Sequence, residues 1–523
     1  MAVTLRTVGL ILLSTLLLTS LFLYGDRLMV TKYFHESLAQ LGPDRAGSGA
    51  GLGNSNLVNS ETGGSATSGK LFKGAQIRTY DPKLLHFSRH KHDAKSLPTH
   101  SAELHALKCP HWSVVTTIFE PSEAVRRQVD LKGWCIVVVG DRKGPKDYPI
   151  NATQNNYVFL TAADQEELAK HFPVVQALPW NHFGRKNVGF LYAILHGARL
   201  VWDFDDDNML LSPEAELNIP SNPWTTSANS TDGFNTSSSS SSSNISGSGS
   251  GGAVAPGWDA TSFGPVFKVM DVRGYSFPSF NPYPLMGAPS SPCWPRGLPL
   301  EHIKYAGLNA SILQRAEIPT TSVGVIQSLA NHDPDIDAIF RLTMPIPFDF
   351  PAEFPVASGA GGSRPLLVPA KTYAPYNAQA TLHMYSSLWS LLLPVTVHGR
   401  VSDIWRGYMA QRLGRDIGMR LLFSPPLVRQ DRNTHNYLAD FDSEEPLYKR
   451  ASRLLQALDD WAPQTGSLVG RIEELWVHLY ERGYLAEGDV ALVQAWLHSL
   501  VAAGYQFPPL LKDAVLTSPP SAW

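Results

Sequence analysis

Residues 201–208 read VWDFDDDN, an apolar run that ends in four aspartates. Two like charges 4 Å apart repel by about 4 kcal/mol at an effective dielectric constant of 20, so such a cluster needs nearby positive charge. Carboxylate oxygens are the ligands that hard divalent cations prefer. The pattern therefore predicts that Asp205 and Asp207 bind Mn²⁺ or Mg²⁺, and that Asp206 or Asp203 orients a ribose or the ion.

Two other interpretations fit the same residues. One is a solvated acidic turn in which Asp207 or Asn208 only caps a helix. The other is an aspartate-nucleophile phosphatase, because an apolar strand followed by Asp-x-Asp, here Asp203-Phe204-Asp205, opens that class of enzyme. In those enzymes the motif lies on the first strand, whereas at least three candidate strands precede it here, which weakens the phosphatase interpretation.

Candidate strands and helices alternate around this motif. We expect strands at Ser113–Phe119, Trp134–Asp141, Tyr157–Leu160 and Arg199–Phe204, and helices at Pro121–Leu131, Asp164–Phe172 and Lys186–His196. This alternation predicts an α/β fold with a mainly parallel sheet and helices on both faces. Further helices are expected over Thr381–Leu392, near Asp403 and, after Glu444, over most of the chain to Leu500. The carboxyl ends of strands are where such sheets bind ligands.

Residues that end the first two strands are candidates for a nucleotide site. Thr116, Thr117 and Asp141 could line a slot for the base and ribose. A pyrophosphate also needs positive charge, and Arg185 and Lys186 stand just before the helix that leads to the acidic strand. The alternative for Arg185 is an ordinary surface arginine.

A second candidate site is the stretch SDIWRGYMAQRL at residues 402–413. There Asp403 could act as a general base toward an acceptor hydroxyl, Trp405 could contact a sugar ring, and Arg406 could neutralise phosphate. The plainer alternative is that Asp403 caps the helix that holds Trp405.

Composition excludes several classes of protein. The chain has 523 residues, with 43 Lys and Arg against 46 Asp and Glu, so its net charge of −3 gives no electrostatic argument for binding nucleic acid. Three cysteines rule out a disulfide-dense scaffold and a four-cysteine zinc site, and allow at most one bridge. Cys135 lies in an apolar run and is expected to be a small core residue; whether Cys109 and Cys293 pair stays open.

The N-terminus has the pattern of a membrane anchor. Val8–Tyr24 carries no charge and reaches about 26 Å as a helix, close to the ~30 Å of a bilayer core. A cleaved signal peptide would have a shorter apolar core and a small-residue cleavage site, which LFLYGD lacks. Glycosylation sequons at Asn151, Asn229, Asn235, Asn244 and Asn309 favour a body in the secretory lumen.

Several long motifs resemble the STELLO family of plants. In chain order they are VVTTIFEPSEAV, WCIVVVGD, LPWNHFGRKNVGFLYAILHGA, VWDFDDDN, NPYPLMGA, WPRGLPLEHI, QSLANHDPDIDAIFRLT, DIWRGYMAQRL and RGYLAEGDVALVQAWLHSLVAAGYQ. The resemblance implies a single-pass Golgi membrane protein with a lumenal glycosyltransferase domain of the GT-A (Rossmann-like) type, distantly related to the reversibly glycosylated polypeptides. It also implies an association with cellulose synthase complexes, and it matches the family's Asp-rich motif to Asp205–Asp207.

These expectations combine into one domain plan. It places a cytosolic tip and signal anchor at 1–25, a flexible stem at 26–75, a nucleotide-sugar-binding half at 76–211, a Ser/Gly-rich insertion at 212–262, an acceptor half at 263–445 and a C-terminal helical region at 446–523.

The predicted function is metal-dependent transfer of a sugar from a nucleotide-diphosphate sugar, a UDP-sugar by resemblance, to a glycan or protein acceptor in the Golgi. It is linked to cellulose or other cell-wall polysaccharides. The alternative is a non-catalytic assembly factor for polysaccharide synthase complexes. The sequence leaves open the sugar, the acceptor, the stereochemical outcome and the oligomeric state.

Overall fold

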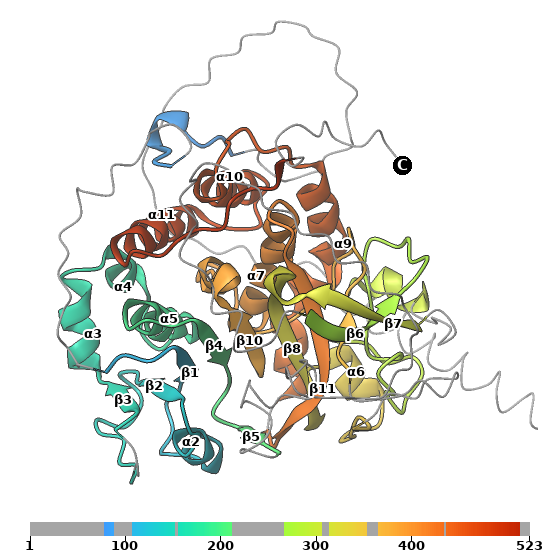
Figure 1. Ribbon diagram of the computed structural model, residues 1–523, viewed down its shortest axis with the longest axis horizontal. Coiled ribbons are helices and arrows are strands. Elements are labelled where there is room, and N and C mark those ends of the chain that lie inside the picture. Colours follow the sequence, from blue (N-terminus) through green and yellow to red (C-terminus); the bar gives the residue numbers. More distant parts are fainter. Residues whose placement is uncertain are drawn as a thin grey trace, which may run out of the picture. The chain divides into compact units, whose positions relative to one another are not determined.

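The computed structural model describes residues 78–87, 107–151, 155–211, 266–305, 313–352, 364–432 and 436–512. They form a mixed α/β structure around one eleven-stranded sheet with the strand order β3-β2-β1-β4-β10-β8-β11-β9-β6-β7 and with β5 paired to β11 (Figure 1). The predicted α/β class is therefore confirmed.

The strands are β1 (His111–Thr116), β2 (Cys135–Val139), β3 (Tyr157–Leu160), β4 (Leu200–Asp203), β5 (Asn208–Leu210), β6 (Val266–Val272), β7 (Leu313–Pro319), β8 (Val323–His332), β9 (Leu366–Leu367), β10 (Thr381–Met384) and β11 (Arg420–Gln430). The helices are α2 (Glu123–Val129), α3 (Ala162–Ala169), α4 (Pro173–Ala177), α5 (Lys186–Leu195), α6 (Ala338–Thr343), α7 (Gly399–Arg415), α8 (Tyr437–Ser443), α9 (Glu445–Asp460), α10 (Leu468–Glu481) and α11 (Glu487–Ala502).

The first four strands make a parallel half-sheet. β2 pairs in parallel with β3 and β1, and β1 pairs in parallel with β4. β10 is antiparallel to both of its neighbours, β4 and β8, while β11 is parallel to β8. Two reversals restore the direction, so the carboxyl ends of β1, β4, β8 and β11 all lie at the same edge of the sheet.

Helices cover both faces of the parallel half, as the sequence predicted. The burial pattern of β2 is continuous, and its side chains alternate between two clusters. Val137 and Val139 pack in the cluster that contains residues of α5, whereas Ile136 and Val138 pack with Val125 and Val129 of α2. A strand buried on both faces reads as an unbroken apolar run, which explains the sequence WCIVVV.

Gly189 sets how closely α5 approaches the sheet. A Cβ at this position would lie 2.6 Å from Val114 Cγ1 and 2.8 Å from Val139 Cγ2. The helix ends at Leu195, and Gly197 follows with φ +90°, the conformation that favours glycine at a helix C-terminus. Because α5 begins at Lys186, its distance from the sheet also positions that lysine.

The C-terminal helices pack beside the parallel half. Contacts join α11 to α4, α5 and α10, and join α7 to α9 and α10 (Figure 1). Their interior includes Trp476 and Trp496, both buried, and the Trp496 indole donates to the Trp389 carbonyl at 3.0 Å. The predicted helical character of the chain after Glu444 agrees with α9, α10 and α11.

One predicted helix is wrong. Thr381–Leu392 divides into the strand β10 and the 3-10 helix η8 (Tyr385–Leu391). β10 has the sequence TLHM, which alternates polar and apolar residues, but four residues are too few for this alternation to outweigh the apolar residues of the 3-10 helix that follows directly.

The cysteines also differ from the expectation. Cys135 is buried as predicted, but it forms a disulfide with Cys109 and so joins β2 to the segment before β1. Cys293 is a free, buried cysteine. The partner of Cys109 is therefore Cys135 rather than Cys293.

The membrane prediction lies outside the structural description. Val8–Tyr24, the stem and the insertion at 212–262 are not among the residues described. Within the part of the chain that is described, no helix has the length and apolar character needed to cross a membrane.

Alanine at Gly189 should destabilise the protein. The added Cβ forces Val114 and Val139 to move, and overpacking of this kind costs about 1–3 kcal/mol of unfolding free energy. Gly488 in α11 is the matched control, because a Cβ there meets only Thr396 Cγ2, at an ordinary 3.5 Å. Urea unfolding should show Gly189→Ala less stable than the parent and Gly488→Ala equal to it or more stable by at most about 1 kcal/mol. Equal stability of the two variants would contradict the close packing of α5.

Candidate nucleotide and metal site

The acidic loop Asp205–Asp207 lies where the strand order of the sheet reverses. The chain runs from β1 outward to β2 and β3, then returns to the other side of β1 as β4. Ligands of doubly wound sheets bind at the carboxyl ends of the strands beside such a reversal. β4 ends at Asp203, and the next residue, Phe204, donates its N–H to the Val114 carbonyl of β1 at 3.2 Å. The loop therefore occupies the expected position for a ligand site.

Asp203 is the buried member of the acidic group. It is fully buried, with Lys186 Nζ 2.6 Å from Oδ1 and Arg406 Nη1 3.1 Å from Oδ2. Burial acts to lower the pKa of Lys186, but the carboxylates of Asp203 and Asp205 outweigh it and raise the pKa, so the lysine stays charged. Asp203 thus neutralises two buried cations and is not open to a ligand.

Asp205 is the exposed member of the group. Its side chain is 34% exposed, and Oδ1 lies 3.0 Å from Lys186 Nζ. The loop is closed by Asn208, whose Oδ1 accepts from the Asp205 N–H at 3.0 Å and whose N–H donates to the Asp205 carbonyl at 2.9 Å. One carboxylate oxygen of Asp205 is therefore held by the lysine while the side chain reaches solvent.

Asp206 and Asp207 are held by two different strands. The Thr117 hydroxyl, just after β1, donates to Asp206 Oδ2, and the Ser122 hydroxyl donates to the Asp206 carbonyl at 2.5 Å. Gln430, at the end of β11, donates its amide to both oxygens of Asp207 at 3.2 and 3.3 Å. The loop is thus held from two sides, by the residue that follows β1 and by the end of β11.

The electrostatics of Asp207 indicate missing positive charge. Burial and the neighbouring charge of Asp205 raise the pKa of Asp207 to about 7, and burial also raises the pKa of Asp206. Four carboxylates have two directly paired cations, Lys186 and Arg406, and Arg432 acts on Asp207 only through space, so the carboxylates of the loop outnumber the cations around them. A divalent ion would balance that excess.

The donor set fits an ion that a substrate helps to hold. Among the residues described, no group of three or more His, Cys, Asp or Glu side chains is arranged to bind a metal by itself. Mg²⁺ is usually bound through one or two carboxylates together with substrate phosphates. Asp205 and Asp207 could supply those two carboxylates, and the raised pKa of Asp207 is what a cation would relieve.

Thr116, Thr117 and Asp141 lie at the ends of adjacent parallel strands. The Thr116 hydroxyl donates to the Val139 carbonyl at 3.1 Å, and the Thr117 N–H donates to the same carbonyl at 3.2 Å. Asp141, two residues beyond β2, accepts from the N–H groups of Arg142 and Asn181 at 2.6 and 2.9 Å. The structure therefore brings these predicted residues to one edge, with Thr117 directly on the acidic loop.

Arg185 does not reach the acidic loop. Its guanidinium is buried and donates to Gln165 Oε1 and to the Leu178 carbonyl at 3.1 Å, and it lies 3.9 Å above the Trp180 ring. Burial lowers its pKa to about 10. These contacts contradict the predicted role of Arg185 toward pyrophosphate, because its donors are committed to structure. The next residue, Lys186, is the one that contacts the acids.

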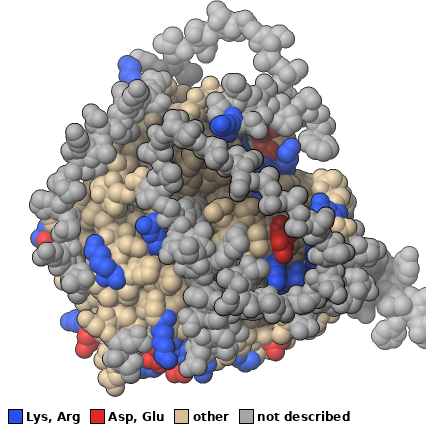
Figure 2. All heavy atoms as spheres, in the orientation of Figure 1, with Lys and Arg blue, Asp and Glu red and all other residues tan. Residues whose placement is uncertain are grey.

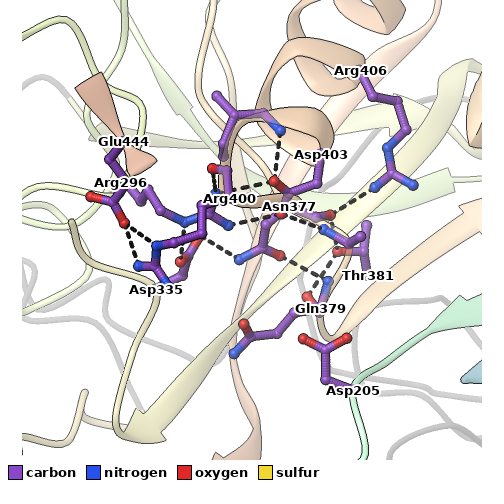
Figure 3. Close-up of polar contacts among 12 residues, drawn as sticks. Asp205, Arg296, Asp335, Asn377, Gln379, Thr381, Arg400, Asp403, Arg406 and Glu444 are labelled. Atoms are coloured by element: carbon purple, nitrogen blue, oxygen red, sulfur yellow. Dashed lines mark hydrogen bonds and ion pairs between the residues drawn. The ribbon is translucent and has the colours of Figure 1, made fainter. Parts of the chain in front are cut away.

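Arg406 and Asp403 belong to a buried polar network (Figure 3). Arg406 is committed to Asp203 and donates to the Asn377 carbonyl at 2.9 Å, so it compensates a protein carboxylate rather than a phosphate. Asp403 accepts two bonds from Arg296, at 3.0 and 2.8 Å, and one from the Ala378 N–H at 3.2 Å. Its side chain is only 6% exposed. The geometry therefore argues against Asp403 as a general base.

Asp403 does not cap its helix either. α7 begins at Gly399 with His398 as its N-cap, which places Asp403 in the second turn, where it faces Arg296. Arg296 also pairs with Asp335 at 2.7 Å. Trp405 is buried as well, so it is not available to a sugar ring.

Sequence reasoning missed Gln430 and Arg296. Neither has a local signal, because their partners are 223 and 107 residues away in the chain. Lys186 was noticed as a positive residue, and its position at the start of α5, facing the end of the next strand, could have identified it as the partner of the acidic strand.

Two comparisons relate this chain to known glycosyltransferases. Residues 400–521 match the family described as STELLO glycosyltransferases. Over 411 residues, 77% of this chain, the sequence is 28% identical to "Probable glycosyltransferase STELLO1" of Arabidopsis thaliana and covers 45% of that protein. The match to "Probable glycosyltransferase STELLO2" of the same plant has the same identity and covers 46% of it. The chain thus spans less than half the length of these two relatives. The chain is therefore similar to the STELLO glycosyltransferases, in agreement with the resemblance predicted from its sequence.

Proposed function

We propose that this protein transfers a sugar from a nucleotide-diphosphate sugar, specifically a UDP-sugar, to a hydroxyl of a glycan or glycoprotein. The observation that carries the proposal is the partly exposed Asp205–Asp207 loop at the reversal point of the sheet, whose carboxylates outnumber the cations paired with them. A bound divalent ion would supply charge stabilisation to the departing diphosphate. Similarity to glycosyltransferases supports the same reaction class.

Individual residues have separate tasks in this proposal. Asp205 and Asp207 would hold Mn²⁺ or Mg²⁺, and Lys186 Nζ, 3.0 Å from Asp205 Oδ1, holds the Asp205 side chain in place. Thr117 fixes Asp206, so that the loop and the ends of β1 and β2, with Thr116 and Asp141, form one wall for the nucleoside. Asp403 has a structural task in this proposal. It binds Arg296 and the Ala378 N–H, and the Ala378 carbonyl accepts from Lys186, so Asp403 helps to hold the lysine and does not take the acceptor proton.

We further propose that the body of the protein lies in the Golgi lumen, anchored by Val8–Tyr24 as a type II membrane protein. The Cys109–Cys135 disulfide supports an oxidising compartment, where such bonds form and persist. Asn151, the first residue of a glycosylation sequon, is exposed. Where the face in Figure 2 is not grey, Lys and Arg side chains and Asp and Glu side chains lie scattered among other residues. An association with cellulose synthase complexes rests on the family resemblance.

The phosphatase and the non-catalytic assembly factor differ from a glycosyltransferase in the role that each gives to Asp203–Asp207. A phosphatase would need Asp203 to attack phosphorus, but Asp203 is fully buried between Lys186 and Arg406. A non-catalytic assembly factor would not need the acidic loop to bind a nucleotide at all. Release of UDP from UDP-sugars by the purified protein separates that alternative from an enzyme.

Removing both proposed metal ligands should abolish metal-dependent nucleotide binding. In calorimetric titrations of the full-length protein with UDP, Mn²⁺ should strengthen binding by the parent at least tenfold, about 1.4 kcal/mol. Asp205→Ala/Asp207→Ala should lose that gain, because the ion then has no carboxylate ligands. Asp147→Asn, at an exposed acidic residue, is the control and should behave as the parent. An unchanged Mn²⁺ effect in the double variant would refute the assignment.

Asparagine at Asp207 should stabilise the metal-free protein at high pH. The pKa of Asp207 is raised from 3.8 to about 7, so the folded state binds more protons than the unfolded state between these values, and stability falls as the pH rises through that window. The amide of the Asp207→Asn variant carries no charge, so the variant should escape this loss.

Thermal unfolding measures the effect. Without metal, Asp207→Asn should melt about 1–3 °C above the parent at pH 8 and close to it at pH 4. With Mn²⁺ at pH 8, only the parent should gain stability. A variant that melts below the parent at pH 8 without metal would show that Asp207 is not strained by its neighbours.

A further inference from the structure

A nucleotide diphosphate brings two or more negative charges into the site, and the arginines expected to meet them are committed elsewhere. Arg185 donates to Gln165 and to backbone carbonyls, and Arg406 is paired with Asp203. Lys186 contacts two carboxylates and the Ala378 carbonyl at 2.7 Å. The metal balances the carboxylates, so further positive charge is needed for the diphosphate itself.

Arg432 lies just beyond the end of β11, the strand that holds Asp207. It follows β11 by two residues, and the strand end immediately before it contacts the acidic loop: Gln430 donates to the Asp207 carboxylate, and the Asp431 N–H donates to the Asp207 carbonyl at 3.4 Å. The positive charge of Arg432 acts to lower the pKa of both Asp207 and Asp335. Arg432 is therefore tied by its strand to the proposed metal ligand.

The guanidinium of Arg432 is buried without full use of its donors. Its side chain is 10% exposed, and within the described residues its Nε has no hydrogen-bond partner. Asp333 Oδ1 lies 3.6 Å from that Nε, beyond hydrogen-bond range, and the same oxygen is bound more closely by Arg341 Nη1. A buried donor without a partner costs free energy and is an unusual feature that needs an explanation.

The local charge count points to an anion. Asp333 is one carboxylate shared by two arginines, Arg341 and Arg432, and the other carboxylates that the charge of Arg432 affects, Asp207 and Asp335, form no ion pair with it among the described residues. Arg341 is also fixed by the Pro334 carbonyl at 2.9 Å and the Ile336 carbonyl at 3.3 Å, which leaves Arg432 as the member with unused donors. Guanidinium groups match phosphate oxygens in geometry as well as in charge.

We infer that Arg432 is a binding residue for the diphosphate of the nucleotide-sugar donor, reaching it from β11 while the metal at Asp205 and Asp207 reaches it from β4. The inference rests on the proposed function, because it takes the donor to be a nucleotide diphosphate. It places the diphosphate between the ends of β4 and β11, and Asp333 orients the arginine without neutralising it.

The test compares two nucleotides on the same full-length protein in Mn²⁺. Arg432→Gln should weaken UDP binding by about 10- to 100-fold, as expected for loss of charge-assisted hydrogen bonds, whereas its effect on UMP, which lacks the second phosphate, should stay within about threefold. Arg432→Lys, which keeps the charge, should recover part of the UDP affinity. Arg429→Gln is the control, since Arg429 lies on the same strand end but is 36% exposed and pairs with Asp431.

The outcomes separate the two proposals. UDP binding by Arg432→Gln equal to that of the parent would overturn the inference and leave the metal site standing. Equal losses for UDP and UMP would also overturn it, because they would show general damage to the site. A parent protein that binds no UDP in Mn²⁺ would refute the proposed function itself, whatever the variants do.

Discussion

The buried carboxylate of Asp203 is the interaction on which the centre of this molecule depends. It lies between Lys186 at the start of α5 and Arg406 in α7, so one side chain joins the sheet to helices from two distant parts of the chain. Such a group is strongly destabilising if one partner is removed, because an uncompensated charge is then left without water. The arrangement fixes where β4 ends, and so where the acidic loop begins.

This arrangement divides the aspartates into two kinds. Asp203 serves the fold, whereas Asp205 reaches solvent and the half-buried Asp207 carries a negative charge that its neighbours do not fully balance. The same division applies to the network around Arg296, which holds Asp335 and Asp403 away from solvent and orders the loop that carries Asn377 and Ala378 (Figure 3). Buried charged side chains that form ion pairs with one another thus lie beside Asp205 and Asp207, whose negative charge is not fully balanced.

Local patterns in the sequence were enough for the parallel half of the fold and the position of the acidic loop. WCIVVV reads as a buried strand, Ser122 caps α2 as expected for a helix start, and VWDFDDDN marks a strand that ends at a polar site. These features depend on residues next to one another in the chain. β10 could not be predicted in the same way, because its burial depends on pairing with β4 and β8.

The roles of individual charged residues were harder to predict for the same reason. Whether an arginine meets substrate or protein is decided by partners such as Asp203, which is 203 residues from Arg406, and Gln165, which is 20 residues from Arg185. Charge and residue type identified Arg185, Arg406 and Asp403 as candidates, but only the fold shows that each is already paired. Thr117 was recognised as a strand end from the sequence, but its contact with Asp206, 89 residues away, is likewise visible only in the fold.

The segment at residues 78–87 has a consequence for where the folded body begins. The Glu473 carboxylate of α10 is buried and accepts the backbone N–H groups of His86 and Phe87 at 2.6 and 2.7 Å. Phe87 itself is buried in the cluster formed by the C-terminal helices. A recombinant fragment that starts after this segment would lack the two N–H groups that donate hydrogen bonds to the buried Glu473 carboxylate. The boundary for expressing the body alone therefore belongs on the N-terminal side of Arg78, ahead of the first residues that the C-terminal helices hold in place.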